Sequence, residues 1–266
     1  MTTTRIAING AAGRMGKRLV ALAGDDSELE LAAALEHDAH SQIGQDSGLL
    51  ADGRANGVPL SGVLEAPVDA VIDFSQPQGA EAIIRWCHAH MTPLVLATTG
   101  LSEATRKAVE AAAAEIPIVS SPNMSLAVNL TLKLAVTAAR ALRGVSSGVD
   151  VEILERHHRF KEDSPSGTAL RFGELISEAM GKTRHTHGRE GMVGKRPAEE
   201  IGYHAIRTGD NPGEHTIIFG LLGETIELRV AASNRDCYAL GALLAAKWVA
   251  GRPAGLYSMF DVLGLE

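Results

Sequence analysis

The segment Gly10-Ala11-Ala12-Gly13-Arg14-Met15-Gly16 is the first indication of how this chain folds. It follows a short β-type run, Arg5–Asn9, and it opens a segment with helical spacing, Arg14–Ala23. Glycines permit a tight turn and let the backbone approach a phosphate, while the helix start offers free N–H groups and the positive end of its dipole. The spacing is G-x-x-G-x-x-G, because Ala12 stands where a middle glycine is commoner. By itself the loop favours dinucleotide binding, with a plain strand–helix turn as the alternative.

Strand-like and helix-like segments continue to alternate through the first half of the chain. Strands are expected at Leu29–Leu35, Val68–Phe74, Pro93–Ala97 and Ile116–Ser120, and helices at Gly79–His90 and Glu103–Glu115, the latter with Ser102 as its N-cap. This order predicts an α/β domain with a Rossmann-like, doubly wound parallel sheet that has helices on both faces.

The second half has a different pattern. Helices are expected at Leu126–Leu142, Thr168–Met180 and Tyr238–Ala250, strands at Val149–Arg156, Ile201–Thr208, His215–Gly220 and Thr225–Ala231, and a long polar loop at Lys182–Glu200. Consecutive strands with short glycine turns predict an α+β domain with a mixed open sheet. We therefore expect a dinucleotide-binding domain of residues 1–124 with 236–266, and a substrate-binding and oligomerisation domain of residues 125–235.

Composition excludes several classes of protein. The chain has 266 residues, more than one compact core usually needs, and a net charge of −7 without a basic stripe, so nucleic acid is not an expected partner. Its two cysteines have no second cysteine nearby, which argues against a thiolate metal site or a disulfide framework. Neither a signal peptide nor an apolar run long enough for a bilayer is visible, so we expect a cytoplasmic protein without membrane contact.

Further cofactor contacts are predicted at the ends of other strands. Glu36 ends the second strand, where an acid bonds the adenosine ribose hydroxyls. His37 and Asp38 follow it; a histidine is a weaker cation than the arginine that pairs with the 2′-phosphate of NADP, so NADH is expected to serve at least as well as NADPH. Small hydroxyl residues in two later loops can contact ribose and carboxamide, although ordinary turn chemistry explains them too. Those loops are Ala97-Thr98-Thr99-Gly100 and Ser120-Ser121-Pro122-Asn123-Met124.

The densest chemistry lies in Glu155–Thr168, which leaves a strand and enters a helix. Five basic side chains fall within six positions of a chain that is acidic overall, and Ser166-Gly167-Thr168 at the helix start can hold a carboxylate. A solvated charged face is the plain alternative. The segment predicts a pocket for an anionic substrate with proton donors in reach. A metal site formed by His157-His158 with His185 and His187 is an alternative hypothesis. It is disfavoured because adjacent residues of a strand, such as His157 and His158, point to opposite sides.

The run E-x-H-H-x-x-K-x-D-x-P-S-G-T-A, carried by Glu155–Ala169, resembles the signature of the 4-hydroxy-tetrahydrodipicolinate reductase family. The resemblance extends over nearly the whole chain and includes the glycine loop, Asp73-Phe74, Thr98-Thr99-Gly100, Asn123, Gly213-Glu214-His215-Thr216 and Ser233-Asn234-Arg235. It implies hydride transfer from NADH or NADPH to 4-hydroxy-tetrahydrodipicolinate with loss of water, in the diaminopimelate route to lysine. It also implies a homotetramer assembled through the second sheet, whose three late strands leave an edge or face to be covered.

The resemblance assigns residues as well. It implies that His157 is the proton donor or acceptor, and that Lys161 is a second proton donor. The substrate-binding positions are His158, Gly167 and Thr168. The cofactor-binding positions are Gly10, Ala11, Ala12, Gly13, Arg14, Met15, Glu36, Ala97, Thr98, Thr99, Ser121, Pro122, Asn123 and Met124. The chain departs from the family at Ala97 (often glycine), Met124 (often aromatic), His37 (often arginine) and Gln76 (often arginine).

Two other classes of function stay open at this point. One is a nicotinamide-binding sensor that uses the same fold without turnover, since a fold does not imply chemistry. The other is a dehydrogenase of another small carboxylate. The paired proton donors His157 and Lys161 distinguish a reductase from a sensor, because a sensor has no need of them.

Overall fold

The structure is a computed structural model, and it describes residues 3–265. The chain divides into two compact units. The first ends at Leu126 and resumes at Arg235, and the second is Ala127–Asn234. The chain therefore leaves the first unit and returns to it at its C-terminal end.

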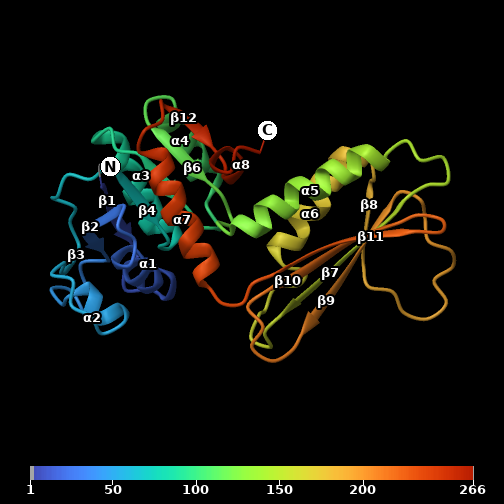
Figure 1. The fold of residues 1–266 in the computed structure, drawn as a ribbon, viewed down its shortest axis with the longest axis horizontal. Helices are drawn as coiled ribbons and strands as arrows, with labels where there is room; N and C mark the ends of the chain where they lie inside the picture. The colour runs from blue at the N-terminus through green and yellow to red at the C-terminus, as the bar shows by residue number, and fades with distance from the viewer. Residues whose placement is uncertain (1–2, 266) are drawn as a thin grey trace. The chain divides into compact units, whose positions relative to one another are not determined.

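A seven-stranded sheet forms the centre of the first unit (Figure 1), in the order β12-β6-β5-β4-β1-β2-β3 with every pair parallel. Its strands are β1 (Thr4–Asn9), β2 (Leu29–Leu35), β3 (Leu60–Ser61), β4 (Ala70–Asp73), β5 (Leu94–Leu96), β6 (Pro117–Ser120) and β12 (Gly255–Tyr257). The predicted doubly wound parallel sheet is confirmed. The carboxyl ends of β1, β4 and β5 meet at one edge, which brings residues distant in sequence together.

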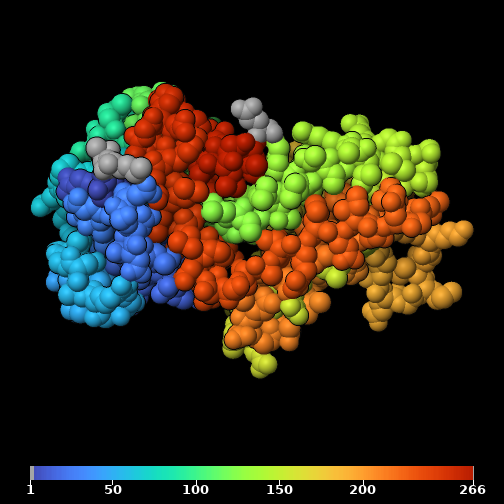
Figure 2. Space-filling view, viewed as in Figure 1, coloured from blue at the N-terminus to red at the C-terminus, as the bar shows by residue number. Residues whose placement is uncertain are grey.

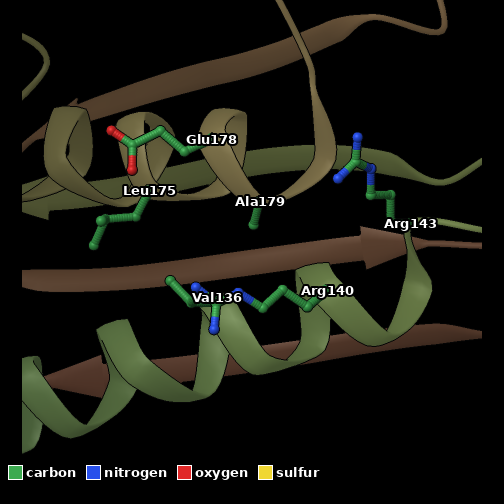
Figure 3. Close-up of a pocket in the computed structure, with 6 residues that line it drawn as sticks. All are labelled: Val136, Arg140, Arg143, Leu175, Glu178 and Ala179. Carbon is green, nitrogen blue, oxygen red and sulfur yellow. The ribbon is translucent and has the colours of Figure 1, made fainter. Parts of the chain in front are cut away.

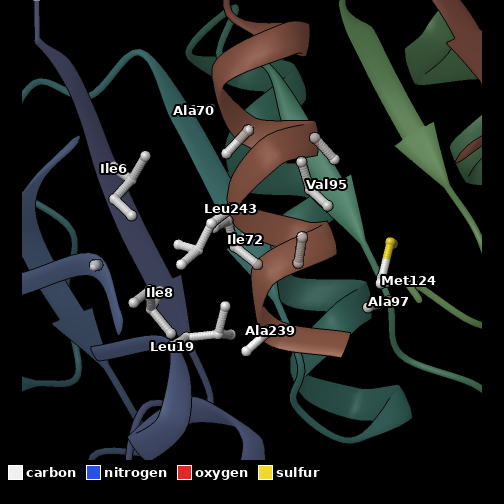
Figure 4. Packing of buried hydrophobic residues seen from close by; sticks show 14 of the residues in the cluster. Ile6, Ile8, Leu19, Ala70, Ile72, Val95, Ala97, Met124, Ala239 and Leu243 are labelled. Carbon is white, nitrogen blue, oxygen red and sulfur yellow. The ribbon is translucent and has the colours of Figure 1, made fainter. Parts of the chain in front are cut away.

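Helices cover both faces of this sheet, and each face has its own buried core. One core, seen in Figure 4, joins Ile8 of the sheet to Leu19 and Leu243. The other joins Val71 to Ile84. The helices of the unit are α1 (Arg14–Gly24), α2 (Ser47–Ala51), α3 (Pro77–Ala89), α4 (Glu103–Ala113), α7 (Asp236–Val249) and α8 (Met259–Val262). Helix α7 packs against α1, β4 and β5, so the end of the chain completes the first core.

Local sequence signals explain where these helices begin. The Ser102 hydroxyl accepts a hydrogen bond from the backbone N–H of Thr105, which confirms the predicted cap of α4. Pro77 begins α3, where a missing N–H costs nothing. The short elements α2, β3, β12 and α8 were not predicted, because two to five residues are too few to show a hydrophobic period.

The second unit holds a five-stranded sheet in the order β11-β10-β7-β9-β8. Its elements are α5 (Leu126–Leu142), β7 (Asp150–His157), α6 (Gly167–Met180), β8 (Arg184–His187), β9 (Glu200–Arg207), β10 (Glu214–Gly220) and β11 (Thr225–Ala231). Central strand β7 pairs parallel with β9 and antiparallel with β10, so the predicted mixed sheet is confirmed. Figure 1 shows α5 and α6 over one face. Alternate residues of β7 from Val151 to His157 are buried.

The prediction of one long loop at Lys182–Glu200 is wrong. Within it, Arg184–His187 forms edge strand β8, parallel to β9. This strand carries no apolar alternation, so the sequence gives no sign of it; polar bonds fix it instead, as when the Thr186 hydroxyl donates to Glu200 over 2.7 Å. The rest of the segment is mostly exposed and stands out from the surface in Figure 2, with Met192 and Val193 in solvent.

Candidate cofactor and active-site residues

The glycine loop between β1 and α1 has a backbone that only glycine can follow at two points. Gly10 has φ +80°, and a Cβ there would lie 2.8 Å from the carbonyl oxygen of Phe74. A Cβ on Gly16 would lie 2.1 Å from the carbonyl oxygen of Gly10. The loop therefore folds tightly against the neighbouring backbone. The first-turn N–H groups of Arg14 and Met15 have no acceptor within helix α1, as at any helix start, and can bind an anion.

Glu36 lies directly beside this loop. Its Oε2 accepts from the N–H of Ala12 at 3.3 Å, and its Oε1 accepts from the N–H of His37 at 3.1 Å. Each oxygen keeps a lone pair for a further donor. The Asp38 carboxylate turns away and sits over Gly62, where a Cβ would meet its Oδ1 at 1.4 Å. The structure thus brings Glu36 and the glycine loop together, and it leaves His37 exposed at the rim.

A buried carboxylate anchors the next loop. Asp73, the last residue of β4, is 0% exposed, and its Oδ2 accepts from the Thr98 hydroxyl at 2.6 Å. Its Oδ1 accepts from Asn9 Nδ2 at 2.7 Å and from the Ser75 hydroxyl at 2.6 Å. Burial raises the pKa of Asp73, while these hydrogen bonds oppose the rise. We call Asp73, Asn9, Ser75 and Thr98 the Asp73 cluster. No role of its own was predicted for Asp73.

The loop after β6 holds the other predicted cofactor residues. The Ser121 hydroxyl donates to the carbonyl oxygen of Asn123 over 2.8 Å, which folds the loop back on itself. Pro122 is exposed and Asn123 is half-buried. Met124 is only 1% exposed and packs in the core drawn in Figure 4. Its thioether therefore fills the interior.

These loops fit a dinucleotide. The tight turn at Gly10, the open N–H groups of α1, the Glu36 carboxylate and the Thr98 hydroxyl all follow strands at one edge of a parallel sheet. Ligands of doubly wound sheets bind outside that edge. Of the remaining predicted residues here, Ala97 is buried and Thr99 is exposed.

In the second unit a second buried carboxylate organises the predicted catalytic segment. Glu155 on β7 is 2% exposed. Its Oε2 pairs with His157 Nδ1 at 2.6 Å and accepts from Arg207 Nη1 at 2.7 Å. Its Oε1 accepts from Arg207 Nη2 at 2.8 Å and from the N–H of Ser166 at 3.0 Å. We call Glu155, His157, Ser166 and Arg207 the Glu155 cluster.

The charges of this cluster are set by its contacts. Burial pushes the pKa of Glu155 upward, but the hydrogen bonds from His157 and Arg207 outweigh it and lower that pKa to about 2. The hydrogen bonding between Arg207 and Glu155 also raises the pKa of Arg207. Glu155 therefore stays ionised at neutral pH. When Glu155 holds Nδ1 of His157 through a proton, Nε2 is left to exchange a proton with a ligand.

Ser166 connects the cluster to helix α6 and to β10. Its hydroxyl accepts from the N–H of Ala169 at 3.2 Å, which caps α6, and it bonds Nε2 of His215 at 3.0 Å. His215 stands edge-on to His157 with ring centroids 5.3 Å apart. Burial lowers the pKa of His215 to about 4, so this ring is neutral at pH 7. The predicted substrate positions Gly167 and Thr168 follow at once in the first turn of α6.

Two more predicted residues complete the segment. Lys161 Nζ pairs with Asp163 Oδ1 at 2.8 Å and lowers the pKa of that carboxyl. Nδ1 of His158 is buried and has no hydrogen-bond partner within residues 3–265, and the same holds for Nε of Arg207. Buried polar atoms without a partner are rare in folded proteins. His158 follows the carboxyl end of β7 and Arg207 ends β9; Nε of Arg156, one residue before the end of β7, is a third such atom.

Sequence reasoning missed Arg207, gave His215 no catalytic context, and expected Ser166 only as part of a helix start that can hold a carboxylate. The partners Glu155 and Arg207 are 52 positions apart, and the parallel register of β7 with β9 sets His157 beside Arg207. No local pattern contains that register. Period-two spacing of Glu155 and His157 on one face of β7 was the available signal.

The four histidines of the metal hypothesis do not form one group. His185 pairs with Ile201 in the β8–β9 register, whereas His157 pairs with Arg207, six residues further along β9, or about 20 Å. His185 Nδ1 instead bonds the Tyr203 hydroxyl at 2.7 Å. Across residues 3–265 no group of three histidine, cysteine or acidic side chains is arranged to hold a metal ion.

A separate hollow of about 400 Å³ lies between α5 and α6, and Figure 3 shows its lining. It is lined by Val136, Arg140, Arg143, Leu175, Glu178 and Ala179, none of which is a predicted site residue. Its residues on α6 stand more than two turns beyond the Ser166 cap. The hollow therefore does not belong to the Glu155 cluster.

Fold and site together define a class of protein. A doubly wound parallel sheet with a glycine loop at its carboxyl edge, in a chain that also carries a buried acid–base network, is typical of nicotinamide-dependent dehydrogenases and reductases. Within residues 3–265 no helix has the length and apolar character needed to cross a bilayer.

Comparison with known proteins narrows the class to one family. The family model for the N-terminus of dihydrodipicolinate reductase matches residues 4–124, and the model for its C-terminus matches residues 127–263. The 4-hydroxy-tetrahydrodipicolinate reductase of Rhodopirellula baltica is 56% identical over 269 residues, covering 98% of this chain and 96% of the relative. That of Alkalilimnicola ehrlichii is 48% identical, covering 99% and 100%. The chain belongs to the dihydrodipicolinate reductase family, and it is an oxidoreductase with a nicotinamide coenzyme.

Solved structures agree on the fold. The dipicolinate-bound dihydrodipicolinate reductase from Paenisporosarcina sp. TG-14 aligns with a TM-score of 0.79 at 24% identity, covering 98% of this chain and 99% of that one. An amine dehydrogenase from Mycobacterium smegmatis aligns with a TM-score of 0.63 at 15% identity, covering 96% and 95%. At these identities the likeness concerns architecture alone.

Proposed function

We propose that this chain reduces 4-hydroxy-tetrahydrodipicolinate to tetrahydrodipicolinate with loss of water, in the diaminopimelate route to lysine. The observation that carries the proposal is the Glu155–His157 pair, a buried carboxylate 2.6 Å from a histidine, inside the part of the chain that the C-terminal family model and the full-length relatives cover. A carboxylate that holds one imidazole nitrogen fixes the ring and leaves the other for proton transfer.

The first unit would bind the coenzyme. The pyrophosphate would lie on the loop from Gly10 to Met15, and Glu36 would accept from the ribose hydroxyls. Residues Ala97, Thr98, Thr99, Ser121, Pro122, Asn123 and Met124 would line the nicotinamide end. The bound coenzyme supplies a hydride. NADH should serve at least as well as NADPH, because the exposed His37 is a weak partner for a 2′-phosphate.

The second unit would hold the substrate and move protons. His157 exchanges a proton through Nε2, and the Lys161 ammonium is the second donor, with a further role in holding a substrate carboxylate. The unpartnered Nδ1 of His158 and the first turn of α6 at Gly167 and Thr168 bind the anionic substrate.

The net step is balanced without any further reactant. A C–H bond forms from the transferred hydride, the C–O bond to the hydroxyl breaks, and the hydroxyl takes one proton from the protein and leaves as water. The substrate is reduced and the coenzyme is oxidised. His157 and Lys161 are the groups able to supply that proton.

A nicotinamide-binding sensor is the weaker alternative. It would account for the glycine loop and Glu36, but it would leave the Glu155 cluster and the unpartnered His158 nitrogen without a purpose. A dehydrogenase of another small carboxylate would have to be reconciled with relatives that carry the same reductase name over their full length.

We further propose that the protein is a cytoplasmic homotetramer assembled through the sheet of the second unit. Strand β11 is mostly exposed, and apolar Ile226, Leu222 and Ile206 lie 39%, 83% and 46% exposed around that sheet. Apolar side chains at an open sheet edge favour pairing with another copy. Light scattering coupled to gel filtration tests the proposal: a mass of four chains supports it, and a monomer overturns it.

The function itself is tested by following the absorbance band of reduced nicotinamide. Purified protein with NADH or NADPH should bleach that band when the cyclic substrate is added, and it should not do so without protein. A protein that binds the coenzyme and yet causes no bleaching with this substrate contradicts the proposal.

A further inference from the structure

Asp73 is a carboxylate of the first unit that accepts four hydrogen bonds, and nothing in the proposed reaction uses it directly. It ends β4, the middle strand of the seven, and it is fully buried. Its four hydrogen bonds come from three directions: Asn9 at the end of β1, Ser75 just after β4, and Thr98 just after β5. No arginine or lysine is among these donors.

The donors connect Asp73 to two loops of the proposed coenzyme site. Asn9 directly precedes the glycine loop, and the Cα of Ser75 packs so close to Gly10 that a Cβ there would lie 2.9 Å away. Thr98 lies in the loop after β5. One carboxylate therefore fixes the glycine loop and the Thr98 loop relative to each other.

The Thr98 bond also sets the polarity of its hydroxyl. A threonine hydroxyl has one hydrogen and two lone pairs. Its hydrogen is directed at Asp73 Oδ2 over 2.6 Å, so only lone pairs are left for anything on the other side of Thr98. Thr98 itself is half-buried and keeps a solvent-facing surface.

We infer that Asp73 is a positioning residue of the coenzyme site, which holds the Thr98 hydroxyl as a pure hydrogen-bond acceptor and thereby selects a coenzyme group that donates an N–H or O–H. This rests on the proposed function, and it names the recognition chemistry at one point of that site. The donor is either the nicotinamide carboxamide or a ribose hydroxyl. Asparagine at position 73 would reverse the arrangement, because its amide N–H₂ would donate to Thr98 and turn the threonine hydrogen outward.

The test is a fluorescence titration of coenzyme binding, which needs no turnover. NADH affinity is measured for the wild type, Asp73→Asn, Thr98→Val, Thr98→Ser and the double variant Asp73→Asn/Thr98→Val. One hydrogen bond corresponds to a weakening of roughly 10-fold. Asp73→Asn and Thr98→Val should each lose about that factor, the double variant should lose no more than Thr98→Val, and Thr98→Ser should bind as the wild type does. Thr131→Val, a buried threonine that bonds only Ala127 within helix α5, is the matched control and should bind normally.

The 3-acetylpyridine analogue of NADH, which lacks the carboxamide N–H, separates the two donors. If the variants lose affinity for NADH but not for the analogue, Thr98 accepts from the carboxamide N–H. If they lose affinity for NADH and for the analogue by the same factor, Thr98 accepts from a ribose hydroxyl. Should Asp73→Asn fail to fold, the contrast between Thr98→Val and Thr98→Ser carries the test. Normal NADH binding by Asp73→Asn, or additive losses in the double variant, overturns the inference while the proposed function stands. A wild type that binds no coenzyme overturns both.

Discussion

Two buried carboxylates, one in each unit, differ in the partners that hold them. Asp73 is held by neutral donors, namely a carboxamide, two hydroxyls and a backbone N–H, and its pKa is raised by burial. Glu155 is also buried, but Arg207 donates to both of its carboxylate oxygens and His157 adds a third bond. The pKa of Glu155 therefore falls to about 2. Burial opposes ionisation at both sites, and only the charged partners reverse the outcome.

The difference matches what each unit is proposed to bind. A coenzyme brings its own negative phosphates, which the helix start of α1 receives, so the Asp73 cluster has only to orient hydroxyl groups. A dicarboxylate substrate and a moving proton require positive charge and a histidine of fixed orientation, and the Glu155 cluster provides both. A buried carboxylate thus serves as a scaffold in one unit and as an electrostatic anchor in the other.

The largest expected effect is on turnover and separates the two units. His157→Gln should lower kcat by about 10²- to 10⁴-fold, the usual contribution of a general acid or base, while the coenzyme Kd stays nearly constant. Steady-state kinetics and fluorescence titration measure the two quantities. His185→Gln, on the edge strand β8, is the matched control and should keep its kcat. Equal loss of turnover and of coenzyme binding would mean that His157 is structural.

The next largest effect is the loss of unfolding free energy when each carboxylate is replaced by its neutral amide. Glu155→Gln leaves the Arg207 guanidinium without its anion, which should cost about 3 kcal/mol of unfolding free energy. Asp73→Asn should cost less, since its partners are uncharged and the change removes a desolvated charge. Denaturant unfolding of both variants provides the comparison. A larger loss for Asp73→Asn would break the contrast between the two clusters.

Acid should destabilise the second unit through His215. Its pKa is about 4 in the folded state against about 6.5 when unfolded, so the unfolded chain binds the extra proton. Neutral His215 makes its full contribution to the free energy of unfolding above pH 6.5. That contribution, about 3 kcal/mol, is lost as the pH falls toward 4. Unfolding measured across that window should show it, and His215→Asn should flatten the slope. The same slope in variant and wild type would contradict a neutral buried ring.

The smallest effect concerns coenzyme choice at the rim of the first unit. The kcat/KM for NADH should equal or exceed that for NADPH, because exposed His37 stands where a permanent cation would bind a 2′-phosphate. His37→Arg should shift the ratio toward NADPH by about 10-fold, one charge-assisted contact. A strong NADPH preference in the wild type would show that another cation binds the 2′-phosphate.

Local rules explain which parts of this structure could be predicted. The turn at Gly10 and Gly16, the cap at Ser102 and the strand β7 depend on short-range spacing, and all were predicted from sequence. Edge strand β8 was missed because polar bonds, not apolar alternation, hold it in place. The Arg207 contact was missed because it depends on the register of β7 with β9 across 52 positions. The sequence shows that an aspartate stands at position 73. It does not show that the ends of three strands meet at this residue.

The most direct test of the proposed reaction follows the hydride itself. NADH carrying deuterium at both C4 positions of its ring is mixed with the protein and the cyclic substrate, and the product is analysed by mass spectrometry. Hydride transfer to the substrate should give a product that has lost one water and gained one deuterium, at a rate that falls strongly in His157→Gln. A product that has lost water but carries no deuterium would contradict reduction by this chain.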